Sequence, residues 1–271
     1  MKRSELIDQI KSKESYLCIG LDTDINKIPK HLLELDDPIF EFNKEIIDQT
    51  KDLCVSYKLN LAFYESQGIK GWESLQKTVE YIPDTIFKIA DAKRGDIGNT
   101  ANMYAKAFFE QMNFDAVTLS PYMGKDSITP FLSIEGKWAI ILGLTSNAGS
   151  EDFQMQKVKN DSGEKYLFES VIERCKSWGS DENTMFVVGA TKEEYFKSIR
   201  TIVPNHFLLV PGVGAQGGSL KEVSRNGLNK DTGLLINSSR GIIYKSDGPN
   251  FGEEAKKSAQ ILRDEMKEIL T

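Results

Sequence analysis

The chain alternates short apolar runs with longer amphipathic segments over its whole length. Runs rich in β-branched and aromatic residues occur at 16–22, 54–64, 85–91, 115–121, 138–146, 185–191, 206–212 and 234–240. Runs that are apolar almost without interruption are typical of parallel strands buried on both faces of a sheet. Helical periodicity appears between or after them, at 37–53, 71–82, 99–112, 164–178, 192–203 and 250–270. This order predicts eight strand–helix units and a (β/α)8 TIM barrel.

The same pattern predicts one domain rather than two. No linker interrupts residues 1–271, a short amphipathic helix is expected at the N-terminus, and the polar stretch 149–163 is expected to form an extended loop after the fifth strand. An open, doubly wound sheet of about five to seven strands is the alternative architecture, and the sequence does not exclude it. In a barrel, the carboxyl-terminal ends of the strands would line the active site.

Composition and charge narrow the class of protein and of partner. The chain has 271 residues, 40% of them hydrophobic, and its longest apolar runs are far shorter than a membrane span. Its net charge of −6 argues against general nucleic-acid binding. The three cysteines lack C-x-x-C spacing and the N-terminus lacks a secretory signal, which favours a reduced cytoplasmic protein without a membrane partner. With only two histidines, neither a histidine-based triad nor a multi-histidine metal site is expected.

Charged residues gather where the third apolar run ends. Asp91, Lys93 and Asp96 form a D-x-K-x-x-D triplet there, and Lys58 interrupts the second apolar run. By itself such a triplet is more often a solvated turn than a catalytic site. Burying an unpaired lysine is costly, so we expect Lys58 to face the barrel mouth and to contact carboxylates. Two aspartates around Lys93 would keep it protonated, which disfavours a Schiff base and suits a proton donor.

A glycine-rich segment follows the seventh apolar run. The sequence PGVGAQGGS at 211–219 matches G-x-G-x-x-G through Gly212, Gly214 and Gly217. A dinucleotide site is not expected, because the motif follows the seventh strand and no acidic residue ends the next strand. In barrels, the loops after strands seven and eight commonly bind phosphate, and Arg240 at the end of the eighth run supplies a bidentate donor.

Two other groups of polar residues leave alternatives open. Ser146 and Asn147, at the end of the fifth run, could hydrogen-bond a heterocycle or form a plain turn. No cluster has convincing metal-ligand spacing, so we predict no metal. The carboxylates that could in principle hold a magnesium ion are Asp22, Asp24, Asp91 and Asp96.

Three segments together resemble the orotidine 5′-phosphate decarboxylase family. They are DAKRGDIGNT at 91–100, PGVGAQGG at 211–218 and SSRGIIY at 238–244, and the resemblance extends from Leu17 to about Tyr244. YKLNLAFYE at 57–65 and GLTSNAGS at 143–150 resemble the branch of the family with longer loops. The resemblance implies a cofactor-free decarboxylation of orotidine 5′-phosphate to uridine 5′-phosphate (UMP), the last step of de novo pyrimidine synthesis. It also implies a homodimer with its sites at the interface.

The resemblance implies a role for each matching residue. Lys93 would protonate C6 as carbon dioxide leaves, and Asp91 would lie near the reacting carboxylate. Asp96 would reach in from the partner subunit, together with Ile97 and Thr100. The other expected contacts are Asp22 and Lys58 at the ribose, Ser146 at the pyrimidine, and Gln216 and Arg240 at the phosphate. Asn147 and Gly217 are further expected substrate-binding residues.

Two other functions would use the same residues. A related barrel decarboxylase that acts on a keto-sugar phosphate shares D-x-K-x-x-D but needs magnesium. The Ser146–Asn147 pair and the Gln216–Arg240 site favour the nucleotide instead. A catalytically inactive barrel kept for ligand binding, or as a dimeric scaffold, is the alternative from another class. The intact D-x-K-x-x-D triplet argues against it.

Overall fold

Eight parallel strands close into a barrel in this structure, a computed structural model that describes residues 1–160, 163–214 and 217–271. Around the barrel the strands follow the order β1-β2-β3-β4-β5-β8-β9-β10, and β10 pairs again with β1. This closure confirms the predicted (β/α)8 barrel and excludes the open sheet. The strands are β1 (Leu17–Gly20), β2 (Ser56–Asn60), β3 (Phe87–Arg94), β4 (Ala116–Leu119), β5 (Trp138–Leu144), β8 (Thr184–Val188), β9 (Phe207–Pro211) and β10 (Leu234–Ser238).

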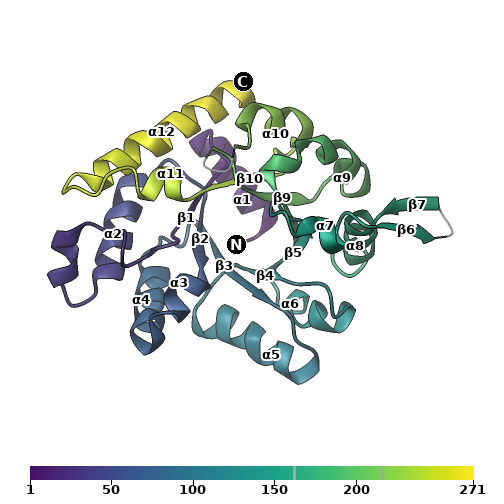
Figure 1. The fold of residues 1–271 in the computed structure, drawn as a ribbon, viewed down its shortest axis with the longest axis horizontal. Helices are drawn as coiled ribbons and strands as arrows, with labels where there is room; N and C mark the ends of the chain where they lie inside the picture. The colour runs from purple at the N-terminus through teal and green to yellow at the C-terminus, as the bar shows by residue number, and fades with distance from the viewer. Residues whose placement is uncertain (161–162, 215–216) are drawn as a thin grey trace.

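A ring of helices surrounds the barrel (Figure 1). Helical connections return the chain to the other end of the barrel, as pairing between parallel strands requires. The α-helices are α1 (Arg3–Lys13), α2 (Pro38–Thr50), α3 (Leu61–Glu65), α4 (Gly68–Tyr81), α5 (Gly98–Lys106), α6 (Thr129–Leu132), α7 (Ser150–Phe153), α8 (Leu167–Lys176), α9 (Phe196–Ile202), α10 (Leu220–Gly227), α11 (Arg240–Ile243) and α12 (Phe251–Leu270). Short 3-10 segments lie at Lys30–Glu34, Lys125–Ser127 and Ala190–Tyr195, and a π-helical turn at Ala107–Gln111 follows α5.

Local sequence and packing agree in helix α2. Asp37 precedes the helix and accepts a hydrogen bond from the backbone N–H of Phe40 at 3.1 Å, and Pro38 occupies the first helical position. On the inner face, Phe42 is buried and stacks on Phe251 of α12, with ring centroids 5.1 Å apart. This contact joins the last helix of the chain to the first unit of the barrel.

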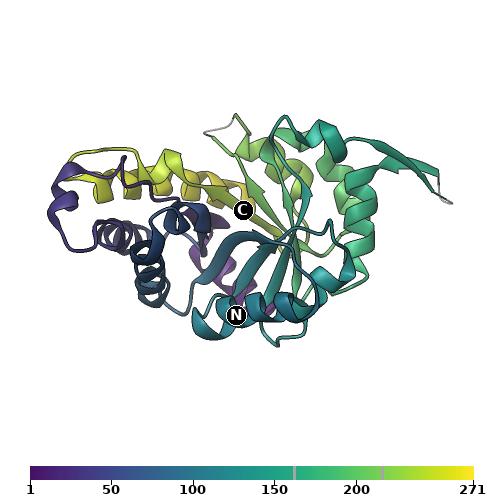
Figure 2. The same cartoon turned by 60° about the horizontal axis from the view of Figure 1, so that its bottom comes forward.

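The connection after β5 contains more regular structure than expected. Instead of an extended loop at 149–163, it has the short helix α7 and the strand β6 (Lys157–Asn160), which pairs antiparallel with β7 (Gly163–Tyr166). A mostly exposed two-stranded ribbon gives no continuous apolar run, so its sequence looks like that of a loop. The hairpin projects beyond the ring of helices (Figures 1 and 2). Helix α8 accordingly begins at Leu167 rather than at residue 164.

Helix α1 packs against the amino-terminal end of the barrel. The Arg3 guanidinium donates to the backbone carbonyls of Asp181 at 3.1 Å and Asn205 at 2.7 Å, and pairs with the Asp231 carboxylate at 3.0 Å. These three partners lie in the turns that lead into β8, β9 and β10. One side chain thus connects the starts of three strands. His206, next to Asn205, is also buried at this end.

Two further predictions concern the chain as a whole. Among the described residues, no helix is long and apolar enough to cross a membrane. Cys18, Cys54 and Cys175 are buried and form no disulfide. Burial raises the pKa of the Cys18 thiol to about 12, so this side chain packs as a small neutral group.

Candidate active site

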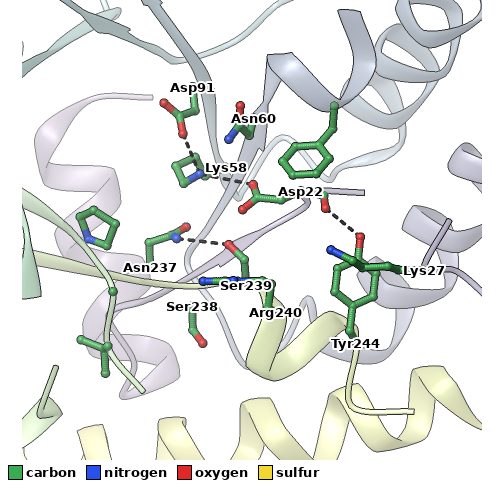
Figure 3. Close-up of a pocket in the computed structure, with 14 residues that line it drawn as sticks. Asp22, Lys27, Lys58, Asn60, Asp91, Asn237, Ser238, Ser239, Arg240 and Tyr244 are labelled. Atoms are coloured by element: carbon green, nitrogen blue, oxygen red, sulfur yellow. Dashed lines mark hydrogen bonds and ion pairs between the residues drawn. The ribbon is translucent and has the colours of Figure 1, made fainter. Parts of the chain in front are cut away.

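A pocket opens at the carboxyl-terminal ends of the strands, and Figure 3 shows the side chains around it. Its cavity volume is about 360 Å³, within the usual range for small-ligand sites. It lies at the end of the barrel where enzymes of this fold have their active sites. Its lining residues are Asp22, Lys27, Lys58, Asn60, Phe63, Asp91, Pro211, Gly212, Val213, Asn237, Ser238, Ser239, Arg240 and Tyr244.

Lys58 is the buried cation of this pocket. It lies on β2 with only 4% of its surface exposed. Its Nζ atom is 2.9 Å from Oδ2 of Asp91 and 3.5 Å from Oδ1 of Asp22 (Figure 3). Burial opposes the charge, but the two carboxylates outweigh it and raise the pKa of Lys58 above its usual value. The prediction that Lys58 contacts carboxylates is therefore confirmed.

Asp91 lies between two ammonium groups. Its Oδ2 accepts from Lys58, and its Oδ1 accepts from Lys93 Nζ at 2.5 Å and from the Thr118 hydroxyl at 3.1 Å. Burial disfavours the ionised carboxylate, but the neighbouring charges of Lys58 and Lys93 prevail and hold the pKa of Asp91 well below its usual range. The carboxylate is thus a fixed negative charge at neutral pH.

The backbone at Lys93 has an unusual conformation. Its φ angle is +48°, in the left-handed region that a residue with a side chain rarely adopts. The pairing between β3 and β4 changes register between Ala90 and Arg94, so the turn forms a bulge at the end of the strand. The Lys93 N–H donates to the Thr118 hydroxyl at 2.9 Å. Bulges commonly redirect a side chain next to an active site, and here the bulge directs the half-exposed lysine toward Asp91.

The opposite side of the pocket has a free cation. Arg240 is exposed at the start of α11, and its guanidinium forms no ion pair or hydrogen bond with the part of the chain that the structure describes. Beside it, Ser239 approaches β1 closely, because a Cβ atom at Gly20 would lie 1.9 Å from the Ser239 hydroxyl oxygen. Asn237 donates to that hydroxyl at 3.3 Å. An unpaired planar donor beside hydroxyl groups suits a phosphate or carboxylate ligand.

The glycine-rich loop after β9 borders this side of the pocket. Gly212, Gly214 and Gly217 all have positive φ angles, of 102°, 77° and 89°, which residues with a side chain rarely adopt. The Gly218 N–H donates to the Gly212 carbonyl at 3.2 Å, which draws the two ends of the loop together. Gly212 lines the pocket, whereas Gly217 does not. Gln216, the expected phosphate ligand, lies outside the described residues.

Several predicted residues lie outside the pocket lining. Asp96 accepts a hydrogen bond from the adjacent Ile97 N–H at 2.8 Å, and Thr100 is exposed on α5. Ser146 is half-buried and Asn147 exposed on the turn after β5. The structure therefore joins the predicted residues Asp22, Lys58, Asp91 and Lys93, although Lys93 itself does not line the pocket. Arg240 does line it.

Sequence reasoning missed several polar residues of the site. Thr118 contacts both Asp91 and the Lys93 backbone, and Asn60 and Asn237 line the pocket. Each of these residues lies in or at the end of an apolar run, as Lys58 does, and that was the available signal. The pocket-lining Tyr244 was also missed as a ligand candidate. Its hydroxyl group donates to the Asp22 carbonyl at 2.8 Å, so it fixes the loop after β1.

Comparison with known proteins gives consistent results. Residues 15–255 match the family model described as Orotidine 5′-phosphate decarboxylase / HUMPS family. The chain is 57% identical over 273 residues to a Bacteroides fragilis protein named orotidine 5′-phosphate decarboxylase, covering 100% of this chain and 98% of that protein. It is 59% identical over 274 residues to the protein of the same name from Flavobacterium johnsoniae, again covering 100% and 98%.

Solved structures show the same similarity. The structure of Leishmania donovani OMP decarboxylase superposes with a TM-score of 0.81 at 36% identity, covering 97% of this chain and 99% of that chain. That of Leishmania donovani UMP synthase gives a TM-score of 0.83 at 38% identity. The match covers 97% of this chain but only 57% of the UMP synthase.

Proposed function

The chain belongs to the orotidine 5′-phosphate decarboxylase family, and from this we propose that it converts orotidine 5′-phosphate to UMP and carbon dioxide in pyrimidine biosynthesis. The enzyme class is that of a carboxy-lyase. The observation that carries the proposal is the charged array of Lys58, Asp91 and Lys93 beside Asp22 at the mouth of the barrel. The lack of a cofactor and the cytoplasmic location stay predictions.

We assign the proton transfer to Lys93. When the bond between C6 and the carboxylate breaks, the electron pair stays on C6 in the plane of the ring, where it is poorly delocalised. An ammonium group positioned beforehand stabilises this charge without reorganising during the step. Lys93 Nζ then gives its proton to C6, which forms the C–H bond of UMP. Asp91, ionised between two ammonium groups, supports this assignment because it holds Lys93 in place.

We assign the rest of the substrate to the remaining polar groups. We propose that Asp22 and Lys58 bind the ribose hydroxyls, and that Ser146 and Asn147 contact the pyrimidine. The phosphate would be held by Arg240 and the glycine-rich loop, including Gln216 and Gly217. Binding energy from a phosphate remote from C6 can be used to form the closed, reactive complex. Orotidine, which lacks the phosphate, should therefore react with a far lower kcat/KM, and equal values would contradict this role.

We further propose a homodimer in which Asp96, Ile97 and Thr100 complete the partner's site. Their position outside the pocket of their own subunit is compatible with that role. Apolar side chains are also exposed just before α5, on α5 and on the neighbouring loop after β4, and such exposure is common at interfaces. They are Ile97, Met103, Tyr122 and Met123, with exposed fractions of 48%, 53%, 90% and 51%.

The decisive experiment follows the ultraviolet absorbance of orotidine 5′-phosphate in the presence of EDTA. We expect the native protein to remove the substrate chromophore rapidly, Lys93→Ala to lose this activity, and the surface variant Lys11→Ala to retain it. Activity that appears only with added magnesium and a keto-sugar phosphate would favour the related decarboxylase. Tight UMP binding without turnover by folded protein would favour the scaffold.

The shared site has its own test. Lys93→Ala and Asp96→Ala should each be inactive alone. When the two variants exchange subunits, half of the dimers are mixed, and each mixed dimer has one intact site, so about a quarter of the native activity should return. A mixture that stays inactive after proven subunit exchange would show that Asp96 acts within its own subunit.

A further inference from the structure

The side chain of Gln154 ties the connection after β5 to the end of that strand. Its Oε1 atom accepts a hydrogen bond from the Thr145 N–H at 2.7 Å, and its Nε2 donates to the Thr145 hydroxyl at 2.9 Å. That hydroxyl is 2.6 Å from Oδ1 of Asn147, to which it donates. Both ends of one amide group therefore hold the residue that precedes Ser146, and the chain of hydrogen bonds continues to Asn147.

Gln154 is itself anchored at the start of α8. Its backbone carbonyl accepts from the Phe168 N–H at 3.0 Å, and the Gln156 carbonyl accepts from the Leu167 N–H at 2.7 Å. The ring of Phe168 is buried and packs edge-on against Tyr195, with centroids 5.4 Å apart. The anchor therefore belongs to the packed body of the barrel, although the hairpin next to it projects away from that body (Figure 2).

The turn at Ser146 is confined from the other side as well. The Gly189 N–H donates to the Leu144 carbonyl at 2.8 Å. A Cβ atom at Gly189 would lie 2.8 Å from the Ser146 backbone nitrogen, so the turn packs directly on the glycine. Ser146 thus lies between Gly189 on one side and Thr145, which Gln154 holds by hydrogen bonds, on the other. Its backbone therefore has little freedom to shift.

We propose that Gln154 is a positioning residue that sets substrate affinity at the pyrimidine by holding the Ser146–Asn147 turn. This inference rests on the proposed function, because it takes the pyrimidine as the ligand of that turn. It gives the connection after β5 a role, because the segment between α7 and β6 brings Gln154 back to the strand end. Gln154 would not touch the substrate, so its removal should weaken recognition of the base and leave recognition of the phosphate unchanged.

The test compares two ligands on matched variants. Gln154→Met keeps the length of the side chain and removes the hydrogen bonds between its amide group and Thr145. Gln156→Met is the control, since it removes one hydrogen bond, to the Glu151 carbonyl, two residues further along the same segment. Dissociation constants are measured for UMP, which has the base, and for ribose 5-phosphate, which lacks it. We expect Gln154→Met to weaken UMP about tenfold, as loss of one or two neutral hydrogen bonds permits.

Two further comparisons make the result specific. Ribose 5-phosphate should bind both variants within about twofold of the native protein, and Gln156→Met should bind UMP normally. In a Ser146→Ala background, Gln154→Met should cause a smaller additional loss than in the native protein, because both residues act through the same turn. Equal weakening of both ligands, no effect of Gln154→Met, or fully additive losses would each overturn the inference. A native protein that neither binds UMP nor consumes orotidine 5′-phosphate would instead overturn the proposed function.

Discussion

At the scale of single residues, the two buried charged side chains of the site, Lys58 and Asp91, each lie beside groups of opposite charge. Lys58 has two carboxylates, and Asp91 has two ammonium groups and a hydroxyl. Removing one member would leave another charge buried without compensation, which costs more than the lost contact alone. The neutral member of this group is Thr118, whose hydroxyl joins the Asp91 carboxylate to the backbone of Lys93.

Thr118→Val should therefore impair the chemical step. Valine keeps the shape of threonine but cannot accept from the Lys93 N–H or donate to Asp91, so the bulge and the ammonium lose a common anchor. We expect kcat to fall about tenfold or more with little change in KM, since catalytic geometry tolerates only small displacements. Steady-state kinetics on the folded variant provide the measurement. Thr118→Ser, which keeps the hydroxyl, should stay close to native, and equal losses in both variants would refute this role.

Some of these residues could be predicted from the sequence and others could not. Lys58 was predictable because a lysine inside an apolar run needs a carboxylate partner. Thr118 was not, because threonine is common in strands and gives no sign of an unusual partner. Its importance depends on the register change between β3 and β4, which is a tertiary feature. Asp96 belongs to the triplet that the sequence singled out, but only the family resemblance implies its role, and that role stays a prediction. In the structure it accepts a hydrogen bond from the adjacent Ile97 N–H.

At the scale of elements, the two ends of the barrel have different tasks. The carboxyl-terminal ends of the strands carry the pocket, whereas α1 holds together the turns before β8, β9 and β10 at the other end. Arg3 is the centre of that contact, and its guanidinium also lies over the ring of Phe207, 5.5 Å from the centroid. Stability and chemistry should therefore respond to different substitutions.

Arg3→Ala should lower the free energy of unfolding without changing the site. The substitution removes two hydrogen bonds to carbonyls, an ion pair and the contact with Phe207, for a loss of about 2–4 kcal/mol. Urea denaturation measures this loss, and kcat/KM of the folded variant should remain native. Lys11→Ala, on the exposed side of α1, should change stability by less than about 0.5 kcal/mol. A large fall in kcat/KM for Arg3→Ala would contradict this division between the ends.

Buried strands and long helices were easier to predict from sequence than exposed strands and short helices. The barrel strands and helices such as α2 and α12 give clear periodicity, and they occur where expected. The β6–β7 hairpin and the eight-residue helix α10 were missed. Short or exposed elements bury few side chains, so their sequences carry little of the pattern that burial imposes.

At the scale of the whole molecule, we expect pH to affect stability through a buried histidine. His206 is 6% exposed, and neither ring nitrogen has a hydrogen-bond partner among the described residues. Burial disfavours the imidazolium and lowers the pKa of His206 to about 4, although Asp181 acts in the opposite direction. Between pH ~6.5 and about 4, the unfolded chain binds a proton at this residue that the native protein does not bind.

The free energy of unfolding should consequently decline as pH falls through this window. His206→Leu should remove the part of the decline due to this residue, which urea titrations at several pH values can measure. The surface variant His31→Leu serves as the control and should keep the native slope. An unchanged slope in His206→Leu would mean that other groups govern acid stability in this range.

The left-handed backbone conformation at Lys93 favours glycine for thermal stability, whereas the proposed activity requires the lysine side chain. A residue with a side chain costs roughly 1–2 kcal/mol in this conformation, whereas glycine adopts it freely. Lys93→Gly should therefore unfold at a higher temperature than Lys93→Ala, the reverse of the usual order, although both lack the ammonium. Among replacements of this lysine, heat resistance alone would favour glycine, but the proposed activity requires the lysine. A stabilised catalyst has to be sought elsewhere in the barrel, with position 93 held fixed.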